Sequence, residues 1–281
     1  MIIALHGETL TTSNLVTHIQ VTRDTGYDAI EFGKPQLVRY LNHGLSIDSI
    51  MDELDGLPVI ALGHVRDIER QETAEYTALL EECERLCSIA EQLNCPNVQL
   101  LTGPLGPGHG KEDPYKGLTG RPWPEMRKLT AKNLAALADI GKQHGVGFYL
   151  EPISWAPLHS LQQGLEVIDE AGQDNVGIMI DFWHMWITGT TPDDIAKLDK
   201  NVINGVHFCD SLPRSGQPIS HKQREVWPGG GSIPLKEWIE AVKATGYDGW
   251  WSPELHSPKH WEMDPWEVAL NLRELLRILY I

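Results

Sequence analysis

Short apolar runs alternate with segments of helical spacing along the whole chain. Eight runs are rich in aliphatic and aromatic residues, and between them lie segments whose apolar residues recur every three or four positions. This alternation is typical of βαβ units that wind around a parallel sheet. The runs predict strands at 2–6, 29–33, 57–63, 97–101, 146–151, 175–181, 202–210 and 249–255.

Two of the intervening segments, 73–93 and 125–144, are long and predict helices. Three strands are introduced by the same kind of turn, in the sequences TGYDAIE (25–31), QHGVGFYLE (143–151) and TGYDGWW (245–251). In each, a Gly just past the helix can adopt the left-handed conformation that ends helices. These turns predict where a helix gives way to a strand.

Eight strand–helix pairs without a long linker favour a single closed (β/α)8 TIM barrel, an α/β fold that forms one domain over residues 1–281. The length fits, since such barrels commonly have about 250 residues. The competing fold is a doubly wound open sheet, whose first turn carries GxGxxG. Here the first run ends in LHGETL, and the GGG at 229–231 precedes a later helix.

The composition is that of a packed globular protein, with 41% hydrophobic and 22% charged residues. The chain has 23 Lys and Arg against 39 Asp and Glu, a formal net charge of −16. Proteins that bind nucleic acids use Lys and Arg to replace the counterions of the phosphates. The charge therefore predicts no nucleic-acid partner.

The N-terminal sequence MIIALHGETL has no basic segment before its apolar residues, which argues against a secretion signal. No apolar run approaches the roughly 18 residues that span a bilayer, so no membrane partner is predicted. The cysteines, Cys83, Cys87, Cys95 and Cys209, form no CxxC pair. They are predicted to be free buried thiols in a reducing, cytoplasmic environment.

The last four predicted strands carry residues that can bind a metal where the strands end. These residues are Glu151, Asp181, His207 and Glu254. Taken singly, they could be an exposed strand end, a helix N-cap, a core histidine and a salt-bridge partner. Neighbouring strands lie only about 4.8 Å apart, so together the four side chains can converge on one ion. Three carboxylates and an imidazole predict one divalent cation, which can be Mn²⁺, Mg²⁺, Co²⁺ or Zn²⁺.

Further side chains are candidates for binding the substrate. His184, three residues after Asp181, can be a hydrogen-bond donor to a substrate oxygen, a fifth ligand in a multinuclear site, or a surface histidine. Three carboxylates on a 2+ ion leave a charge of −1, so a nearby cation is expected. Arg224 is the first candidate and Arg214 the second.

The chain has 10 Trp but only 4 Phe, and five Trp lie within a few residues of the proposed ligands. Flat indole rings can stack on the apolar face of a sugar ring. We predict that Trp227 and His64, which ends the third strand, belong to the substrate site. Trp250 and Trp251 are consecutive on one strand and cannot both face inward. The remaining two Trp of this group are Trp183 and Trp186.

Several segments resemble the xylose isomerase-like TIM barrels, the sugar phosphate isomerase/epimerase group. They are LEP, DNVGIMIDFWH, VHFCD, REVWPGGGSIPL and GYDGWWSPELH, and the similarity extends over essentially the whole chain. Within the group, the DNVG and VWPG segments resemble those of the inosose isomerases. Relatives in the group include ketose 3-epimerases, hydroxypyruvate isomerases, inosose dehydratases and 3-dehydroshikimate dehydratases.

The resemblance implies a role for each matching residue. Glu151, Asp181, His207 and Glu254 match the group's single divalent-metal site, and in its isomerases the two glutamates also transfer the proton. His184 matches a histidine that contacts the substrate. The chain departs from the group at Glu225, where an Arg usually stands three residues before the Pro. Arg224 lies one position earlier, so either the loop is shifted or the substrate differs in its anionic group.

Endonuclease IV shares this fold but needs more ligands, because it binds three zinc ions. His64 and His184 can supply part of that set. The fourth strand, however, ends in LLTGP without a histidine, and no DxH pair follows His207. Together with the charge of −16, these absences argue against a nuclease.

The predicted function is a metal-dependent isomerase or epimerase of a sugar or keto-inositol. The metal would bind the carbonyl and a neighbouring hydroxyl, and Glu151 and Glu254 would move the proton through an enediolate. Because the acidic surface repels phosphate, a neutral polyol ketone is the preferred substrate.

Three alternatives stay open. A dehydratase of a cyclic hydroxyketone, inosose or 3-dehydroshikimate, would share the first step of the reaction. A non-catalytic sugar-binding barrel would keep the aromatic residues but has no need of four converging ligands. The apolar C-terminal segment LRELLRILYI can form a homo-oligomer interface or pack on its own barrel.

Overall fold

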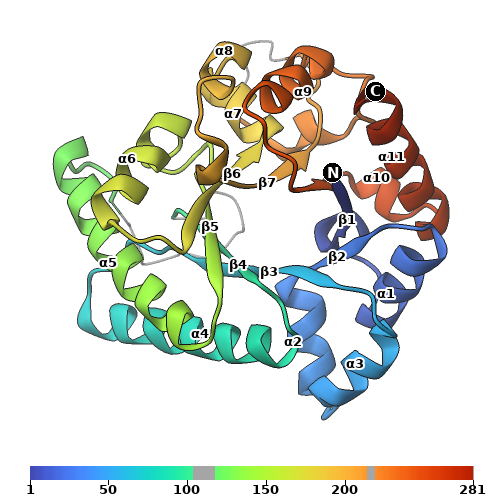
Figure 1. Cartoon of the computed structure of the whole chain (residues 1–281), viewed down its shortest axis with the longest axis horizontal. Helices are drawn as coiled ribbons and strands as arrows, with labels where there is room; N and C mark the ends of the chain where they lie inside the picture. Colours follow the sequence, from blue (N-terminus) through green and yellow to red (C-terminus); the bar gives the residue numbers. More distant parts are fainter. Residues whose placement is uncertain (104–117, 214–218, 281) are drawn as a thin grey trace.

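The computed structural model describes residues 1–103, 118–213 and 219–280, and its strands form a closed parallel barrel in chain order (Figure 1). Each strand pairs with the next, and β8 pairs with β1 to close the barrel. The predicted (β/α)8 fold is confirmed. The strands are β1 (Ile2–His6), β2 (Ala29–Phe32), β3 (Val59–Arg66), β4 (Asn97–Leu101), β5 (Gly147–Glu151), β6 (Val176–Asp181), β7 (Ile203–Phe208) and β8 (Trp250–Pro253).

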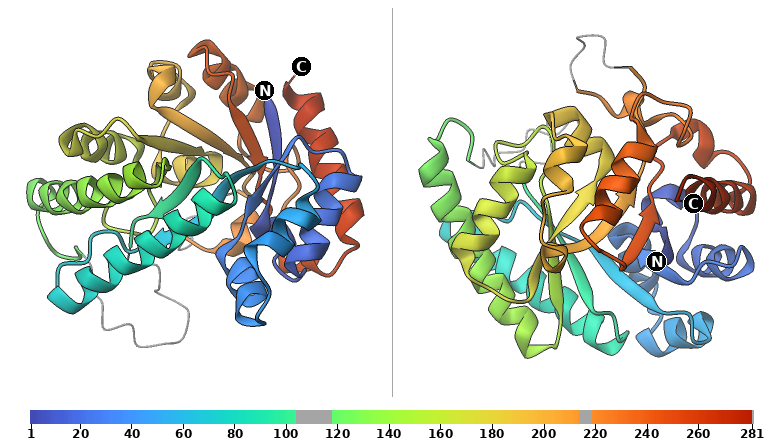
Figure 2. Two further views of the ribbon diagram at one scale, coloured as in Figure 1. Left: turned by 60° about the horizontal axis from the view of Figure 1, so that its bottom comes forward. Right: turned by 45° about the horizontal axis from the view of Figure 1, so that its top comes forward.

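Helices surround the barrel on all sides (Figure 2). Both long helices are confirmed, with bounds within two residues of those predicted. The described helices are α1 (Leu15–Asp24), α2 (Lys34–Asn42), α3 (Ile47–Leu54), α4 (Thr73–Gln92), α5 (Trp123–Gln143), α6 (Leu161–Ala171), α7 (Phe182–Thr188), α8 (Pro192–Ile195), α9 (Leu235–Ala244), α10 (Pro258–Trp261) and α11 (Pro265–Tyr280). None of them is long and apolar enough to cross a membrane.

The glycines of the three recurring turns adopt the left-handed conformation that the sequence predicts. The φ angles of Gly26, Gly145 and Gly246 are 73°, 68° and 80°. The third strand is longer than predicted and ends at Arg66 instead of residue 63. It continues because Val65 and Arg66 pair with Leu100 and Leu101 of β4, and Val65 is fully buried in the core.

The barrel has a small interior core and a larger outer core beneath the helices. The interior core consists of Ala61, Tyr149, Met179 and Trp250. Trp251 points the other way, into the outer core, as the alternation along a strand requires. Gly205 makes room for the inward indole, since a Cβ there would lie 2.3 Å from the ring of Trp250.

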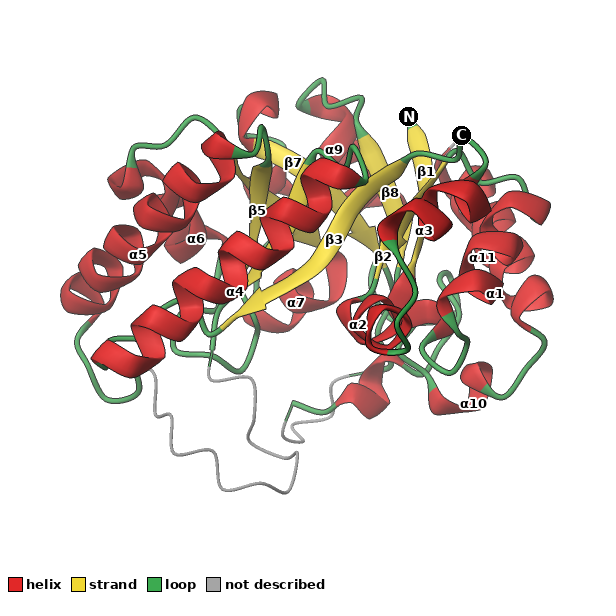
Figure 3. Cartoon of the chain, turned by 90° about the horizontal axis from the view of Figure 1, so that it is seen from below, coloured by secondary structure: helices red, strands yellow, loops and turns green. Residues whose placement is uncertain are grey.

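The carboxyl ends of the strands lie at one end of the barrel, together with the short helices α7 and α10 (Figure 3). All four cysteines are buried and free, as predicted. Helix α11 buries one apolar face, including Leu272 and Leu276, against the rest of the fold. The C-terminal segment therefore packs on its own barrel.

Candidate metal centre

Four side chains from neighbouring strands converge at the carboxyl end of the barrel. Glu151 ends β5, Asp181 ends β6, His207 lies in β7, and Glu254 follows β8. One ligand atom of each lies within 4.8 Å of the others, and all four residues are buried. His207 Nδ1 is 3.4 Å from a Glu151 oxygen and 3.8 Å from an oxygen of each of the other two carboxylates. The structure thus brings together the four residues that the strand ends predict.

Asp181 both caps a helix and faces the centre. Its Oδ1 accepts a hydrogen bond of 2.6 Å from the backbone N–H of His184, which caps the N-terminus of α7. Its Oδ2 lies 3.8 Å from His207 Nδ1. The two interpretations that the sequence leaves open, helix cap and ligand, are therefore compatible, because they use different oxygens.

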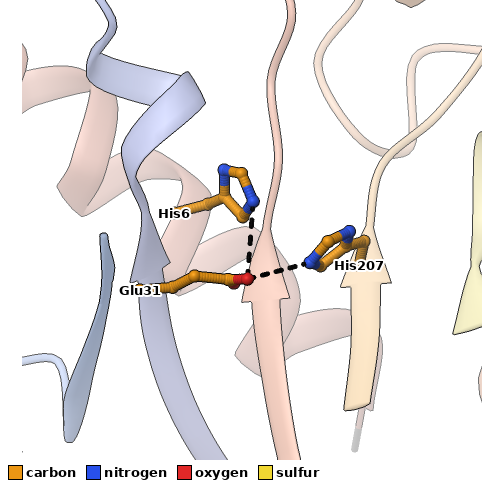
Figure 4. A group of neighbouring side chains, drawn as sticks. All are labelled: His6, Glu31 and His207. Atoms are coloured by element: carbon orange, nitrogen blue, oxygen red, sulfur yellow. Dashed lines mark hydrogen bonds and ion pairs between the residues drawn. The ribbon is translucent and has the colours of Figure 1, made fainter. Parts of the chain in front are cut away.

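His207 is held from its other ring nitrogen by a second buried group (Figure 4). His207 Nε2 lies 3.3 Å from Glu31 Oε1, and His6 Nε2 lies 3.6 Å from the same oxygen. These three residues are close enough to hold a metal. However, His6 Nδ1 accepts a hydrogen bond from the backbone N–H of Glu8, which places the proton of the ring on Nε2. We therefore assign the group to a network that supports His207.

Glu31 is the anionic centre of that network. The Tyr149 hydroxyl also donates to Glu31 Oε1. Burial raises the pKa of Glu31, but the neighbouring rings of His6 and His207 lower it to about 2. An ionised Glu31 holds the His207 Nε2–H, so that Nδ1 faces the other carboxylates. Sequence reasoning missed both His6 and Glu31. Their signal is a polar residue within, or at the end of, an otherwise apolar strand.

The donor set fits one divalent cation. Burial raises the pKa of Asp181 to about 8; the charge of Arg224 opposes this shift, and the charges of Glu151 and Glu254 add to it. Burial lowers the pKa of His207, but Glu31 and the other carboxylates raise it well above its usual value. His207 Nδ1 is buried without a hydrogen-bond partner among the described residues. A cation between this nitrogen and the carboxylates would satisfy all four groups.

Arg224 is the described arginine that reaches this centre. Its guanidinium contacts Glu254, lies 3.6 Å from Asp181 Oδ2, and sits 5.0 Å from the ring centroid of Trp183. Burial lowers the pKa of Arg224, but the two carboxylates raise it above its usual value. Arg214, the second candidate, lies outside the described residues. The cation that the excess negative charge predicts is thus present at Arg224.

A cavity of about 230 Å³ opens at this centre and is lined by two of the four residues, Glu151 and Glu254. This is smaller than the roughly 300–1,000 Å³ of pockets for drug-sized ligands, so it suits a compact molecule. Glu151 faces it with one oxygen held by the Gln99 amide, at 2.5 Å. Glu254 faces it with one oxygen 3.0 Å from His256 Nε2. The sequence analysis did not identify Gln99 or His256 as residues of the site.

His184 lies in the wall of this cavity and is almost fully buried. Its Nδ1 accepts a hydrogen bond of 3.1 Å from the backbone N–H of Ser154, which leaves the proton on Nε2. Nε2 lies 3.9 Å from Glu151 Oε1. Burial lowers the pKa of His184 well below its usual value, so the ring is neutral. It can therefore donate one hydrogen bond toward the cavity, and it is not a surface histidine.

His64 also lines the cavity, as predicted, from the end of β3. Burial and the nearby charge of Lys34 lower its pKa to about 4, so this ring is also neutral near pH 7.

The structure places Trp227 apart from the other predicted substrate-binding residues. The turn after Arg224 carries Trp227 toward α10, where its ring lies 4.5 Å from the His260 ring, and it does not line the cavity. Trp186 likewise packs on Trp238. The aromatic wall is formed instead by Trp155 and Phe32, which the sequence did not single out.

A closed (β/α)8 barrel with a buried carboxylate–histidine centre at the carboxyl ends of its strands defines the class of protein. The model of one family, the xylose isomerase-like TIM barrel, matches residues 19–279. The chain belongs to this family, and the resemblance stated above is confirmed.

The chain is similar in sequence to curated relatives and in fold to solved structures. The inosose isomerase of Halalkalibacterium halodurans is 27% identical over 275 residues, which cover 95% of this chain and 91% of the relative. The 3-dehydroshikimate dehydratase of Pseudomonas aeruginosa is 22% identical over 227 residues, or 80% of this chain and 33% of the relative. The crystal structure of IOLI protein with a binding zinc atom has a TM-score of 0.89 at 21% identity, covering 100% of this chain and 98% of that one.

Proposed function

We propose that the protein is a divalent-metal-dependent isomerase or epimerase of a keto-inositol or a related polyol ketone. The observation that carries the proposal is the placement of Glu151 and Glu254 at the two ends of the β5–β8 arc of one four-residue centre, both facing the same small cavity. Similarity to inosose isomerases over nearly the whole chain supports the substrate class. Similarity to a D-psicose 3-epimerase over 44% of the chain supports the reaction class.

Glu151, Asp181, His207 and Glu254 would hold the cation. When bound, the cation supplies Lewis-acid polarisation of a substrate carbonyl, which acidifies the neighbouring C–H bond. His184 would donate its Nε2–H to a substrate oxygen.

The two glutamates differ in their partners, and this difference suggests separate roles. Glu254 is paired with Arg224 and His256, whereas the nearest polar groups to Glu151 include the neutral Gln99 amide. Less of the charge of Glu151 is compensated, so we assign proton removal to Glu151 and proton return to Glu254.

The reaction balances as a 1,2-proton shift. Glu151 takes the proton from the carbon next to the carbonyl, and the C–H electron pair forms the C=C bond of an enediolate. Glu254, which first takes up a proton from solvent, then gives that proton to the former carbonyl carbon, and Glu151 releases the proton it took to solvent, so that both carboxylates return to their starting state. Meanwhile the hydroxyl proton passes to the former carbonyl oxygen, so that the ketone is re-formed one position along. In an epimerase the proton returns to the original carbon from the opposite face.

The experiment is incubation of the metal-loaded protein with a keto-inositol in D₂O over many turnovers. We expect one solvent deuterium in the product, and loss of turnover after removal of the metal with EDTA. Turnover without any deuterium would exclude the enediolate route. Binding of the ketone without turnover or exchange, for this and all other sugars tested, would support a non-catalytic sugar-binding barrel instead.

The roles of the glutamates can be separated by exchange. We expect Glu254→Gln to keep wash-out of the substrate proton into D₂O while losing isomerisation, and Glu151→Gln to lose both. Because both residues are proposed ligands, the metal content of each variant is measured alongside.

A dehydratase of a cyclic hydroxyketone is the second candidate, and the 3-dehydroshikimate dehydratase similarity over 80% of the chain favours it. This reaction shares the proton removal by Glu151 but then expels a β-hydroxyl. A new enone absorbance during turnover would identify the dehydratase. A change of sugar configuration without that absorbance would identify the isomerase or epimerase.

Cytoplasmic location, the absence of a nucleic-acid partner and possible homo-oligomer formation stay predictions. Helix α11 leaves Leu270 and Ile278 47% and 66% exposed, which provides a modest apolar surface for a second copy. Light scattering of the purified protein would determine the oligomeric state.

A further inference from the structure

A second cavity of about 680 Å³ lies between α2, β3 and α4, and adjoins the candidate active cavity. We call it the α2–α4 cavity. Four basic side chains line it, against one acidic side chain. These are Lys34, Arg39, Arg66 and Arg70, with Glu82. Even with Asp67, which lies 3.5 Å from Arg66, the local charge is about +2 in a chain whose formal net charge is −16.

The inner part of the cavity is organised by one shared carboxylate. Glu82 contacts Lys34 Nζ and lies 3.2 Å from Arg70 NH2. Both cations also donate to backbone carbonyls of β3: Lys34 to His64 at 3.2 Å, and Arg70 to Arg66 at 3.0 Å. Their side chains are only 20% and 11% exposed, so their positions are fixed and their charge is poorly screened. One carboxylate between two cations leaves a net positive charge at this position.

The outer part of the cavity carries two arginines with unused donors. Arg39 donates to the Ser13 carbonyl through NH2, at 2.9 Å, and Arg66 is half exposed. A guanidinium has five N–H donors, so each retains several that can bind an oxyanion. The cavity therefore combines a fixed charged base with two arginines at its mouth.

The two cavities share part of their wall. His64 and Arg66 line both of them. A ligand in the α2–α4 cavity therefore lies next to the candidate active cavity, and one molecule can extend from one to the other.

We propose that the α2–α4 cavity binds a phosphate-type dianion. A charge of −2 neutralises the local excess, and the tetrahedral oxygens suit the arginine donors. The dianion can be inorganic phosphate or the phosphate ester of a small polyol, for which the volume leaves room. The second source rests on the proposed function, whereas binding of inorganic phosphate does not. The net charge of the whole chain predicts a neutral substrate, but the local charge beside the active cavity has the opposite sign.

The test is calorimetric titration of EDTA-treated full-length protein with inorganic phosphate at constant ionic strength. EDTA treatment prevents phosphate from binding to a metal ion. We expect saturable binding that weakens about tenfold in Arg39→Gln and in Arg66→Gln. The matched control is Arg277→Gln, which removes the same charge from an exposed position on α11 and should bind phosphate as the unmodified protein does.

Absence of saturable binding, or equal weakening in Arg277→Gln, would overturn the proposal. Two outcomes support it and distinguish the sources. If the site holds the ester arm of a substrate, phosphate competes with a phosphorylated ketone, and Arg39→Gln, at a residue that lines the α2–α4 cavity but not the candidate active cavity, raises the KM of that ketone while leaving an unphosphorylated ketone unaffected. If the site holds a free anion, phosphate binds without competing with either ketone. The calorimetry requires no turnover, so its result is independent of the proposed reaction.

Discussion

Replacing Glu31 by Gln tests whether the network behind His207 controls metal binding. The substitution keeps the shape of the side chain and removes its charge. Glu31 is 1% exposed and contacts His207 Nε2 at 3.3 Å, which is longer than an optimal hydrogen bond. A hydrogen bond to a charged group contributes about 1.5–3 kcal/mol, and at this distance we expect the lower part of that range. Loss of about 1.4–2 kcal/mol corresponds to a 10- to 30-fold weaker Zn²⁺ or Mn²⁺ affinity.

The assay is competition between the protein and a chromogenic chelator of known affinity. Glu69→Gln is the control for replacing a buried carboxyl by an amide outside the centre; because Glu69 retains its proton near pH 7, this variant changes no charge. Tyr149→Phe, which removes one donor to Glu31 and keeps its charge, should have a smaller effect. If Glu31→Gln binds metal within twofold of the unmodified protein, or if Tyr149→Phe weakens binding more than Glu31→Gln does, the reasoning is refuted.

Three further predictions concern stability. Removing the metal with EDTA should lower the Tm, and added Zn²⁺ should restore the Tm in a concentration-dependent way, because the cation binds only the folded centre. A Tm that changes neither with EDTA nor with Zn²⁺ would contradict a metal site. Gly205→Ala should lower the free energy of unfolding by about 1–3 kcal/mol in urea titrations, because its Cβ would lie 2.3 Å from the Trp250 ring, and the added change Trp250→Phe should recover part of that loss. Burial raises the pKa of Glu69 from 4.5 to about 8, so the folded state retains a proton that the unfolded state releases. The free energy of unfolding should therefore fall between about pH 4.5 and 8, by at most about 4–5 kcal/mol. Glu69→Gln should remove that loss, and equal pH profiles for the two proteins would contradict the prediction.

The barrel and the four candidate ligands could be predicted because both depend on local pattern. Apolar runs mark the strands, and in a parallel barrel every strand end reaches the same rim, so residues such as Glu151 and Glu254 meet without any knowledge of the packing between them. The position of Arg224 followed from charge balance. The four candidate ligands could therefore be predicted from the positions of the strands, and Arg224 from the charge of those ligands.

The supporting residues could not be predicted, because their contacts cross the barrel. Glu31 and His207 are separated by 176 residues, and nothing in either strand indicates the other. The sequence predicted the positions of loop residues least accurately. Trp227 lies close to Arg224 in sequence but faces α10, whereas Trp155, on the segment after β5, lines the cavity. The α2–α4 cavity also depends on a pairing, that of Lys34 with Glu82, between separate helices.

The inward side chain of Trp250 limits how a ligand can reach and leave the metal centre. With Tyr149 and Met179 it fills the middle of the barrel below His207, so side chains of the described residues occupy the interior between the metal centre and the amino-terminal end of the strands. We therefore expect substrate and product to use the same mouth, at the carboxyl end of the barrel. Product therefore has to leave before the next substrate enters, and a ligand seated at the shared wall of His64 and Arg66 would stand in the path of both.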